Sequence, residues 1–202
     1  MVETISKTII FVRHGESELH KDANRFCGVL DPALTPNGVA QAGRARETLA
    51  QLALRFDETW TSPRERAQQT ARIILPGARW QVMEDLRELS FGAWEGLTKE
   101  EARAKTPEAY DAWDEDAYNN APPGGESGHQ AEPGIERLLT HIESSAASRI
   151  LFVSHTTFLR LFISKLIDLP LTESRKRLDV QMGRIGMLEV SGRKGKLKAL
   201  NL

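Results

Sequence analysis

Cysteine is almost absent from this 202-residue sequence, because Cys27 is the only one. One cysteine forms no internal disulfide, so the chain lacks the pattern of a small disulfide-stapled secreted protein. Long apolar runs are also missing, since the longest, at residues 150–153 and 158–167, are bounded or interrupted by polar and charged residues. We therefore expect no membrane span and no signal peptide, and a cytoplasmic location.

An excess of either charge is missing too. The sequence has 27 Lys and Arg against 28 Asp and Glu, a formal net charge of −1. We therefore expect no nucleic-acid partner, because such proteins usually need a broad basic face. Any anion-binding site must therefore be formed by a few cationic side chains at specific positions. The 40% hydrophobic content is typical of an ordinary globular protein, and we expect a single domain over residues 1–202.

Two apolar strands are predicted to end in histidine. Residues 8–12 are a β-branched and aromatic run that stops at Arg13 and His14. Residues 149–153 repeat this construction and lead through a serine into His155. In open α/β sheets, ligands bind at the carboxyl ends of the strands. We therefore expect both imidazoles at a binding edge of the sheet.

The remaining pattern alternates helices with short strands, as in the α/β class. We expect helices over about 36–54, 62–74, 135–147 and 156–167, strands over 57–61 and 80–83, and a terminal hairpin of 184–190 and 196–200. Residues 86–97 are predicted to form a shaped loop. Residues 98–130, about a sixth of the chain, are predicted to form a mainly helical cap insertion over the site.

Arg66 is predicted to lie in the first turn of the second helix. A helix N-terminus is electropositive, so a cation there is disfavoured unless an anion joins it. This position indicates phosphate or carboxylate binding. A neutral imidazole can attack phosphorus, guanidinium groups can hold phosphoryl oxygens, and a carboxyl group can protonate the leaving group. The combination predicts phosphoryl transfer.

The sequence resembles the histidine phosphatase superfamily, in its phosphoglycerate mutase-like branch. The resemblance rests, in family order, on residues 13–17 (RHGES), 31–38 with 41–42, 61–71 (TSPRERAQQTA), 86–88 with 91–96, and 153–155. It implies a three-layer αβα sandwich with a central, mostly parallel sheet and a small helical cap. It also implies a metal-independent phosphatase that hydrolyses a small-molecule phosphomonoester without a cofactor.

The resemblance gives five residues a role in the reaction. His14 is the implied nucleophile, which forms a phosphohistidine, and His155 stabilises the transferring phosphoryl group. Arg13 and Arg66 bind the phosphate, and Glu88 is the general acid and base. Substrate contacts are expected from Arg13, Ser17, His20, Cys27, Gly28, Arg66 and Thr156.

Two of the expected substrate contacts depart from the family pattern. His20 stands where many relatives have asparagine, and Thr156 stands where the family often has glycine. We expect substrate preference to depend on both. Residues 111–118 resemble the caps of α-ribazole phosphatases and of other small-sugar or cofactor-precursor phosphatases, so the implied partner is a small phosphorylated metabolite. The resemblance also implies a homodimer.

Other functions remain open at this stage. A cofactor-dependent phosphoglycerate mutase is the alternative within the family, but the resemblance implies that mutases are longer between the acid-bearing loop and the second histidine. Two histidines and a carboxylate could instead hold a metal. A non-catalytic module could have kept the phosphate pocket. Glu88 could form a structural ion pair with Arg87 or Arg13.

Several conspicuous residues have a structural interpretation. His129 and His141 are not expected to be catalytic, and Cys27 is expected to form part of the pocket wall without a redox role. Arg64 is interpreted as a surface residue. The four tryptophans are assigned to core and cap packing; they are Trp60, Trp80, Trp94 and Trp113.

Overall fold

The computed structural model describes residues 6–21 and 23–202, with a six-stranded sheet at its centre in the order β3-β2-β4-β1-β5-β6. The strands are β1 (Lys7–Arg13), β2 (Glu58–Thr61), β3 (Gln81–Val82), β4 (Arg149–Ser154), β5 (Ile185–Ser191) and β6 (Lys194–Ala199). The first four are mutually parallel, whereas β5 pairs antiparallel with both β1 and β6. The mostly parallel sheet predicted from the sequence is confirmed.

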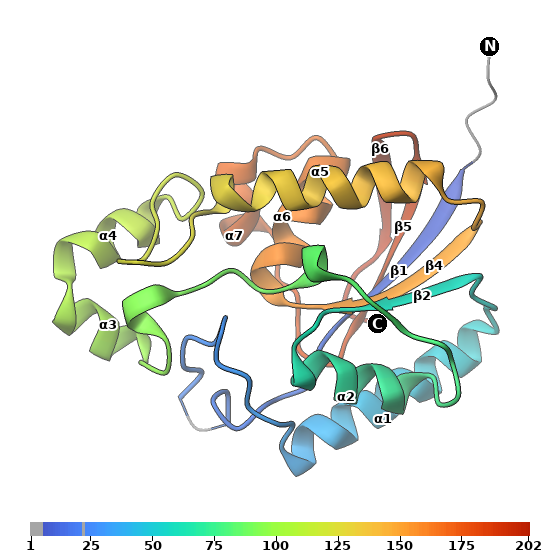
Figure 1. The fold of residues 1–202 in the computed structure, drawn as a ribbon, viewed down its shortest axis with the longest axis horizontal. Helices are drawn as coiled ribbons and strands as arrows, with labels where there is room; N and C mark the ends of the chain where they lie inside the picture. Colours follow the sequence, from blue (N-terminus) through green and yellow to red (C-terminus); the bar gives the residue numbers. More distant parts are fainter. Residues whose placement is uncertain (1–5, 22) are drawn as a thin grey trace.

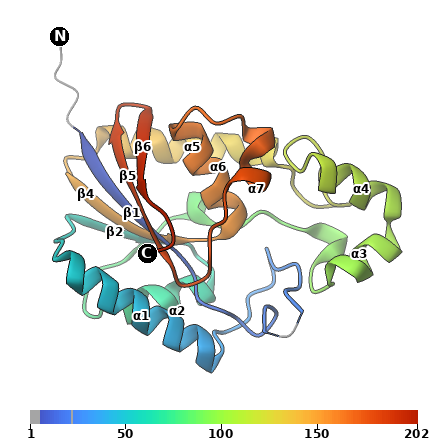
Figure 2. The same ribbon diagram turned by 180° about the vertical axis from the view of Figure 1, so that it is seen from behind.

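Helices cover both faces of this sheet. They are α1 (Pro36–Leu52), α2 (Glu65–Ile74), α3 (Lys99–Lys105), α4 (Pro107–Glu115), α5 (Gly128–Ser144), α6 (Thr156–Leu166) and α7 (Ser174–Arg177). Figure 1 shows α1 and α2 on one side of the sheet and α5 and α6 on the other, with α3 and α4 beyond one end. Figure 2 shows the same layers from behind, with the β5–β6 hairpin toward the viewer. The predicted αβα sandwich is therefore confirmed.

Alternation along β1 explains why the strand is held from both sides. Ile9 and Phe11 join the core cluster formed with α5 and α6, whereas Ile10 and Val12 join the cluster formed with α1 and α2. Successive strand side chains point to opposite faces, so a strand buried on both sides is apolar throughout. The two cores therefore fix the end of β1, where His14 follows.

The first two helices begin close to where the sequence predicts. Thr35 caps α1, because its hydroxyl oxygen accepts the N–H of Gly38 at 3.0 Å. The second helix begins at Glu65 rather than at Ser62, because Arg64 is extended and its N–H donates to the Ser62 hydroxyl at 3.2 Å. The later start still leaves Arg66 in the first turn.

The cap insertion has two short helices, and it ends where α5 begins. The sequence predicts the next helix from residue 135, but α5 begins at Gly128, because Ser127 and Gln130 form a reciprocal capping box. The short α7 was not predicted at all. No helix in residues 6–21 and 23–202 is long and apolar enough to cross a membrane.

Candidate active site

The two predicted histidines meet at the carboxyl end of the sheet. β1 and β4 are parallel neighbours, with Arg13 in register with Ser154. The ladder continues past the strands, since the His14 N–H donates to the Ser154 carbonyl at 3.0 Å. The next residue on each strand is a histidine, and the His14 and His155 ring centroids lie 5.0 Å apart. Register alone therefore brings together residues 141 positions apart in the sequence.

Hydrogen bonding determines which tautomer His14 adopts. Its Nδ1 lies 2.7 Å from the Gly15 carbonyl oxygen, which only accepts, so Nδ1 carries the proton and Nε2 keeps a free lone pair. Burial, followed by the neighbouring His155 and Arg66, holds the His14 pKa well below its usual range. The imidazole is therefore neutral at physiological pH.

Gly15 is required by close packing rather than by an unusual backbone angle. A β-carbon at Gly15 would lie 2.4 Å from the Gly38 carbonyl oxygen. The N-terminal turn of α1 therefore packs directly against the backbone after His14. The Gly15 N–H also donates to the Thr70 hydroxyl at 3.0 Å, which ties this turn to α2.

Arg66 is fully buried and held by the backbone of the preceding loop. Its guanidinium donates to the carbonyls of Cys27, Gly28 and Leu30 at 3.1, 3.2 and 2.8 Å, and it lies 3.4 Å from Asp31. Carbonyl oxygens orient the cation but do not neutralise it. The side chain is therefore fixed in place, and Asp31 at 3.4 Å is the carboxylate that pairs with its positive charge.

Arg13 is held by the backbone of the segment between α7 and β5. Its guanidinium donates to the Val180 carbonyl at 2.8 Å. Burial lowers its pKa to about 10, so it stays charged at neutral pH. Two rigid cations thus stand beside His14. Nε of each arginine is buried without a hydrogen-bond partner among the described residues.

Glu88 sits at the N-terminus of α6. Its carboxylate accepts the N–H groups of Leu89 and Thr157, both at 3.1 Å, and of Phe158 at 3.3 Å. Burial raises its pKa, an effect that exceeds the opposing contributions of these N–H groups and of the neighbouring arginines. A carboxyl group with a raised pKa holds a proton that it can donate.

The predicted alternative of an ion pair between Glu88 and Arg87 is not formed. Arg87 instead makes a two-pronged pair with Glu126, with both N–O distances 2.7 Å. Glu126 also accepts the Ser90 N–H at 2.7 Å. The loop that carries Glu88 is therefore anchored from outside, which leaves the Glu88 carboxyl group for another purpose.

The predicted substrate contacts divide into two groups. His20, Cys27 and Thr156 line a cavity of about 210 Å³ together with Arg13, His14 and Glu88. Ser17 and Gly28 lie behind that lining: the Ser17 hydroxyl is 2.7 Å from His20 Nδ1, and the Gly28 carbonyl holds Arg66. Arg66 is fully buried and is not among the lining residues either, so three of the seven predicted contacts lie outside the lining.

His20 and Cys27 are both buried enough to suppress ionisation. Burial beside Arg13 and Arg66 lowers the pKa of His20 to about 3, so its imidazole is neutral. Burial raises the pKa of the Cys27 thiol to about 11, so the thiolate needed for redox or nucleophilic chemistry does not form at neutral pH. Cys27 therefore acts as a wall of the cavity.

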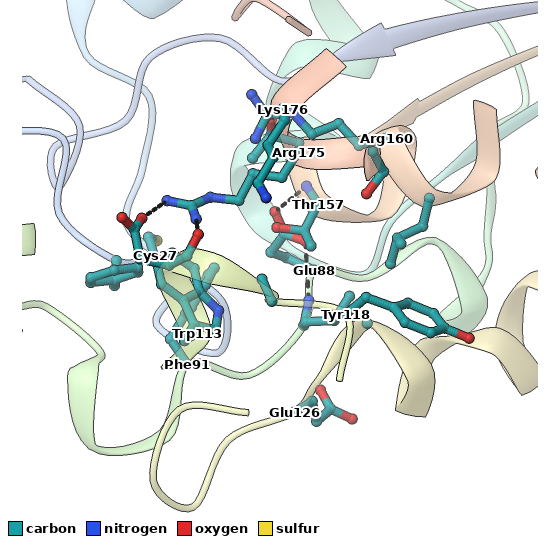
Figure 3. Close-up of a pocket in the computed structure, with 18 of the residues that line it drawn as sticks. Cys27, Glu88, Phe91, Trp113, Tyr118, Glu126, Thr157, Arg160, Arg175 and Lys176 are labelled. Carbon is teal, nitrogen blue, oxygen red and sulfur yellow. Dashed lines mark hydrogen bonds and ion pairs between the residues drawn. The ribbon is translucent and has the colours of Figure 1, made fainter. Parts of the chain in front are cut away.

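The outer part of the cavity contains cations that sequence reasoning missed. Arg160 of α6 and both Arg175 and Lys176 of α7 line it, together with Phe91 and Trp113 (Figure 3). Arg160 had a detectable signal, since it follows Thr156 by four residues and so shares its face of α6. The α7 residues had none, because no pattern predicted this short helix beside the site.

The interpretation of Arg64 as a surface residue is wrong. Its side chain is half-buried, and its Nε is buried without a partner within the described ranges. Arg64 also contributes to the lowered pKa of His155 and of Glu126. It lies close to the site because the extended backbone before α2 turns it inward.

The other histidines lie away from the reaction centre. His129 is exposed and pairs with Glu132 at 3.1 Å, and the His141 ring packs against Trp60 at a centroid distance of 5.1 Å. Trp60 and Trp94 are fully buried, and Trp113 nearly so. Across the residues described, no three His, Cys, Asp or Glu side chains are grouped so that they could hold a metal ion.

Comparison with known proteins gives consistent matches. The model of the histidine phosphatase superfamily (branch 1) matches residues 9–202. An adenosylcobalamin/α-ribazole phosphatase of Salmonella typhimurium is 32% identical over 193 residues, 94% of each chain. A phosphoglycerate mutase of Schizosaccharomyces pombe is 34% identical over 187 residues, 87% of this chain and 86% of its own.

Solved structures match as well. The α-ribazole phosphatase from Shigella flexneri superimposes with a TM-score of 0.86 at 28% identity and covers 96% of both chains. A mycobacterial glucosyl-3-phosphoglycerate phosphatase in complex with VO3 also has a TM-score of 0.86, at 26% identity, and covers 96% of this chain and 98% of its own.

Proposed function

Since the chain belongs to the histidine phosphatase superfamily and is a small-molecule phosphatase, we propose that it hydrolyses its phosphomonoester through a phosphohistidine on His14. The observation that carries this proposal is the hydrogen bond from His14 Nδ1 to the Gly15 carbonyl. This bond leaves the Nε2 lone pair free within a cavity that also contains Arg13 and Glu88.

In the first step, His14 Nε2 attacks phosphorus in line with the ester oxygen. The N–P bond forms as the P–O bond to the leaving group breaks, and protonated Glu88 gives its proton to the departing alkoxide. In the second step, Glu88 takes a proton from water, whose oxygen attacks phosphorus. The N–P bond breaks, inorganic phosphate is released, and neutral His14 and protonated Glu88 are restored.

The surrounding charges stabilise the transferring group. Arg13 and Arg66 hold the phosphoryl oxygens, and His155 donates to the group as it moves between oxygen and nitrogen. Both arginines are already oriented by carbonyl groups, so little reorganisation accompanies substrate binding. The adjoining part of the substrate site is formed or supported by Ser17, His20, Cys27, Gly28 and Thr156.

Substrate size and chemistry follow from the cavity above Glu88. Aromatic side chains, including Phe91, Trp113 and Tyr118, line it beside the cations of α6 and α7 (Figure 3). A small phosphorylated metabolite with a planar or apolar portion suits such a lining. The relatives named for α-ribazole and glucosyl-3-phosphoglycerate suggest two starting points for a substrate panel.

The direct test is phosphate release from that panel by the purified protein, with His14→Ala as the matched control. We expect turnover by the wild type and loss of turnover in the variant. A labelled phosphoryl group should be trapped on the wild type only, in a form that acid releases. Equal turnover by both proteins would contradict the proposal. An inert wild type that still binds vanadate would identify a phosphate-binding module instead.

A second assay separates hydrolysis from isomerisation, which matters because one relative is a phosphoglycerate mutase. The protein is incubated with 3-phosphoglycerate and a catalytic amount of the bisphosphate. We expect phosphate release, at a rate that is the same before and after exhaustive chelation of metal ions. Rapid isomerisation without phosphate release would favour the mutase. Activity restored only by a divalent metal would favour a metal hydrolase.

We also propose a cytoplasmic location and a homodimer, with no nucleic-acid partner. The single, unreactive Cys27 suits a reducing compartment, and the near-neutral net charge suits a protein that binds no nucleic acid. Sedimentation at several concentrations tests the dimer, and a purely monomeric protein at all of them would exclude it.

A further inference from the structure

Ser62 lies at the end of β2, beside the strand that carries His155. It is fully buried, and its N–H donates to the Val153 carbonyl at 3.0 Å, which extends the β2–β4 ladder by one residue. Its backbone position is therefore fixed relative to β4. In the sequence, Ser62 stands in the 61–71 segment that carries the resemblance, but only Arg66 of that segment was given a role.

The Ser62 hydroxyl contacts the imidazole of His155. Oγ lies 2.7 Å from His155 Nε2 and also accepts the N–H of Arg64 at 3.2 Å. A hydroxyl that donates to Nε2 while it accepts from Arg64 has both of its roles satisfied. In the opposite arrangement, with Nε2 as donor, the buried hydroxyl proton has no acceptor among the described residues, which is unfavourable.

This network determines which nitrogen of His155 carries the proton. Burial and the neighbouring Arg66 and Arg64 hold the pKa of His155 well below its usual range, so the ring is neutral and has one N–H. Since Nε2 accepts from Ser62, that proton is on Nδ1. Nδ1 is buried and has no partner in the described part of the chain, and the ring lies beside His14.

We propose that Ser62 is a positioning residue that fixes His155 in the Nδ1-protonated tautomer, so that the free N–H donates to the phosphoryl group carried by His14. The inference rests on the proposed function of His14 and deepens it. The opposite tautomer presents a lone pair to the anionic oxygens and repels them. Ser62 therefore decides whether a neutral His155 stabilises or opposes transfer.

A double-mutant cycle tests whether Ser62 acts through His155. Kinetic constants for p-nitrophenyl phosphate are measured for the wild type, Ser62→Ala, His155→Ala and the double variant. We expect Ser62→Ala to lower kcat about 10- to 100-fold with little change in KM, since removal of one transition-state donor costs up to about 10³-fold. We expect it to cost almost nothing further in the His155→Ala background. The same loss in both backgrounds would overturn the inference.

Two controls separate this role from simple destabilisation. Ser164→Ala removes another fully buried serine hydroxyl, one without a partner in the described residues, and is expected to leave kcat unchanged. Ser62→Thr keeps the hydroxyl and is expected to restore most of the kcat lost in Ser62→Ala. Thermal unfolding of each variant shows whether it folds, and failure of the threonine to restore activity in a folded protein would count against the inference.

The tautomer can be observed without turnover. ¹⁵N NMR of the imidazole distinguishes a protonated from an unprotonated nitrogen, with His155→Ala for assignment. We expect a protonated Nδ1 in the wild type and a mixture in Ser62→Ala. A protonated Nε2 in the wild type would overturn the inference even in an active enzyme. If the protein showed the expected tautomer but had no phosphatase activity, the effect of Ser62 on His155 would stand and the proposed function would be refuted.

Discussion

Glu88 combines two opposing electrostatic influences in one side chain. Its carboxylate accepts N–H groups from the first turn of α6, which favours the charged form, whereas full burial favours the neutral form. Burial dominates, so the pKa rises. A carboxyl group that stays protonated at a higher pH, yet is stabilised when it ionises, suits a group that gives up and retakes a proton in each cycle.

The first prediction concerns Glu88→Gln. The glutamine keeps the shape of the side chain but cannot protonate a leaving group. We therefore expect kcat/KM, which reports on transfer to His14 and not on the later attack by water, to fall about 10²- to 10⁴-fold with an alkyl phosphate. With p-nitrophenyl phosphate, whose leaving group needs no proton, the loss should be much smaller. Steady-state kinetics with both substrates provide the check. Equal losses would mean that Glu88 does not act as the acid.

The second prediction is the pH dependence of kcat. The pKa of His14 is lowered, so the nucleophile should remain neutral as the pH falls through 6.5, and no acid limb is expected there. The pKa of Glu88 is raised above its ordinary 4.5, so its proton is present below the raised value and lost as pH rises through it. We expect kcat for an alkyl phosphate to decline on the alkaline side, and this limb to disappear in Glu88→Gln. An acid limb near pH 6.5 would contradict the neutral His14.

At the scale of elements, the loop before α1 is fixed by a carboxylate far away in the sequence. Glu95 accepts the N–H groups of Gly28, Val29 and Leu30, at 2.9 to 3.1 Å, and that of Phe91 at 2.9 Å. The carbonyls of the same loop hold the guanidinium of Arg66. Glu95 therefore fixes the position of Arg66 indirectly, through this loop.

The third prediction follows from this support. We expect Glu95→Gln to weaken the loop, because hydrogen bonds to a charged acceptor contribute about 1.5–3 kcal/mol each and a neutral amide cannot replace them all. KM and the vanadate inhibition constant should rise together about 10- to 150-fold, corresponding to the loss of one such bond. Glu47→Gln, at an exposed position of α1, is the matched control and should change neither. A drop in kcat alone would indicate a role in proton transfer instead.

Strand ends were predictable from the sequence, but the contacts between loops were not. Apolar runs that stop at His14 and His155 predict neighbours in a parallel sheet because the geometry of such sheets is general. The N-terminal position of Arg66 likewise follows from local helix signals. Nothing local relates Glu95 to Gly28, because their contact depends on how two irregular loops fold against each other. The short α7 was missed for the same reason.

On the scale of the whole molecule, the cap has its own small core. Phe26, Trp94, Tyr110 and Trp113 pack together with Ala102, apart from the two clusters that flank the sheet. The sequence predicted an aromatic cap but not its attachment. One end is tied down by the pair of Arg87 and Glu126, and the other by contacts between α4 and α7.

The fourth prediction tests this second attachment, which centres on Arg175 of α7. Its guanidinium pairs with Asp114 at 2.7 Å and lies 4.1 Å from the centroid of the Trp113 ring (Figure 3). Its charge is thus used to hold the cap against the body at the edge of the cavity. A partly shielded ion pair together with a cation–π contact contributes about 1–2 kcal/mol, so Arg175→Ala should release α4 without unfolding the sheet. We expect faster hydrogen exchange in residues 107–115 and an unchanged kcat for p-nitrophenyl phosphate. The KM for the physiological substrate should rise about 5- to 30-fold, which is the same free energy expressed as a ratio.

Arg177→Ala removes a neighbouring exposed cation that pairs with Glu173 and should leave all three measurements as in the wild type. If exchange in the cap were unchanged while KM rose, Arg175 would bind the substrate directly rather than position the cap.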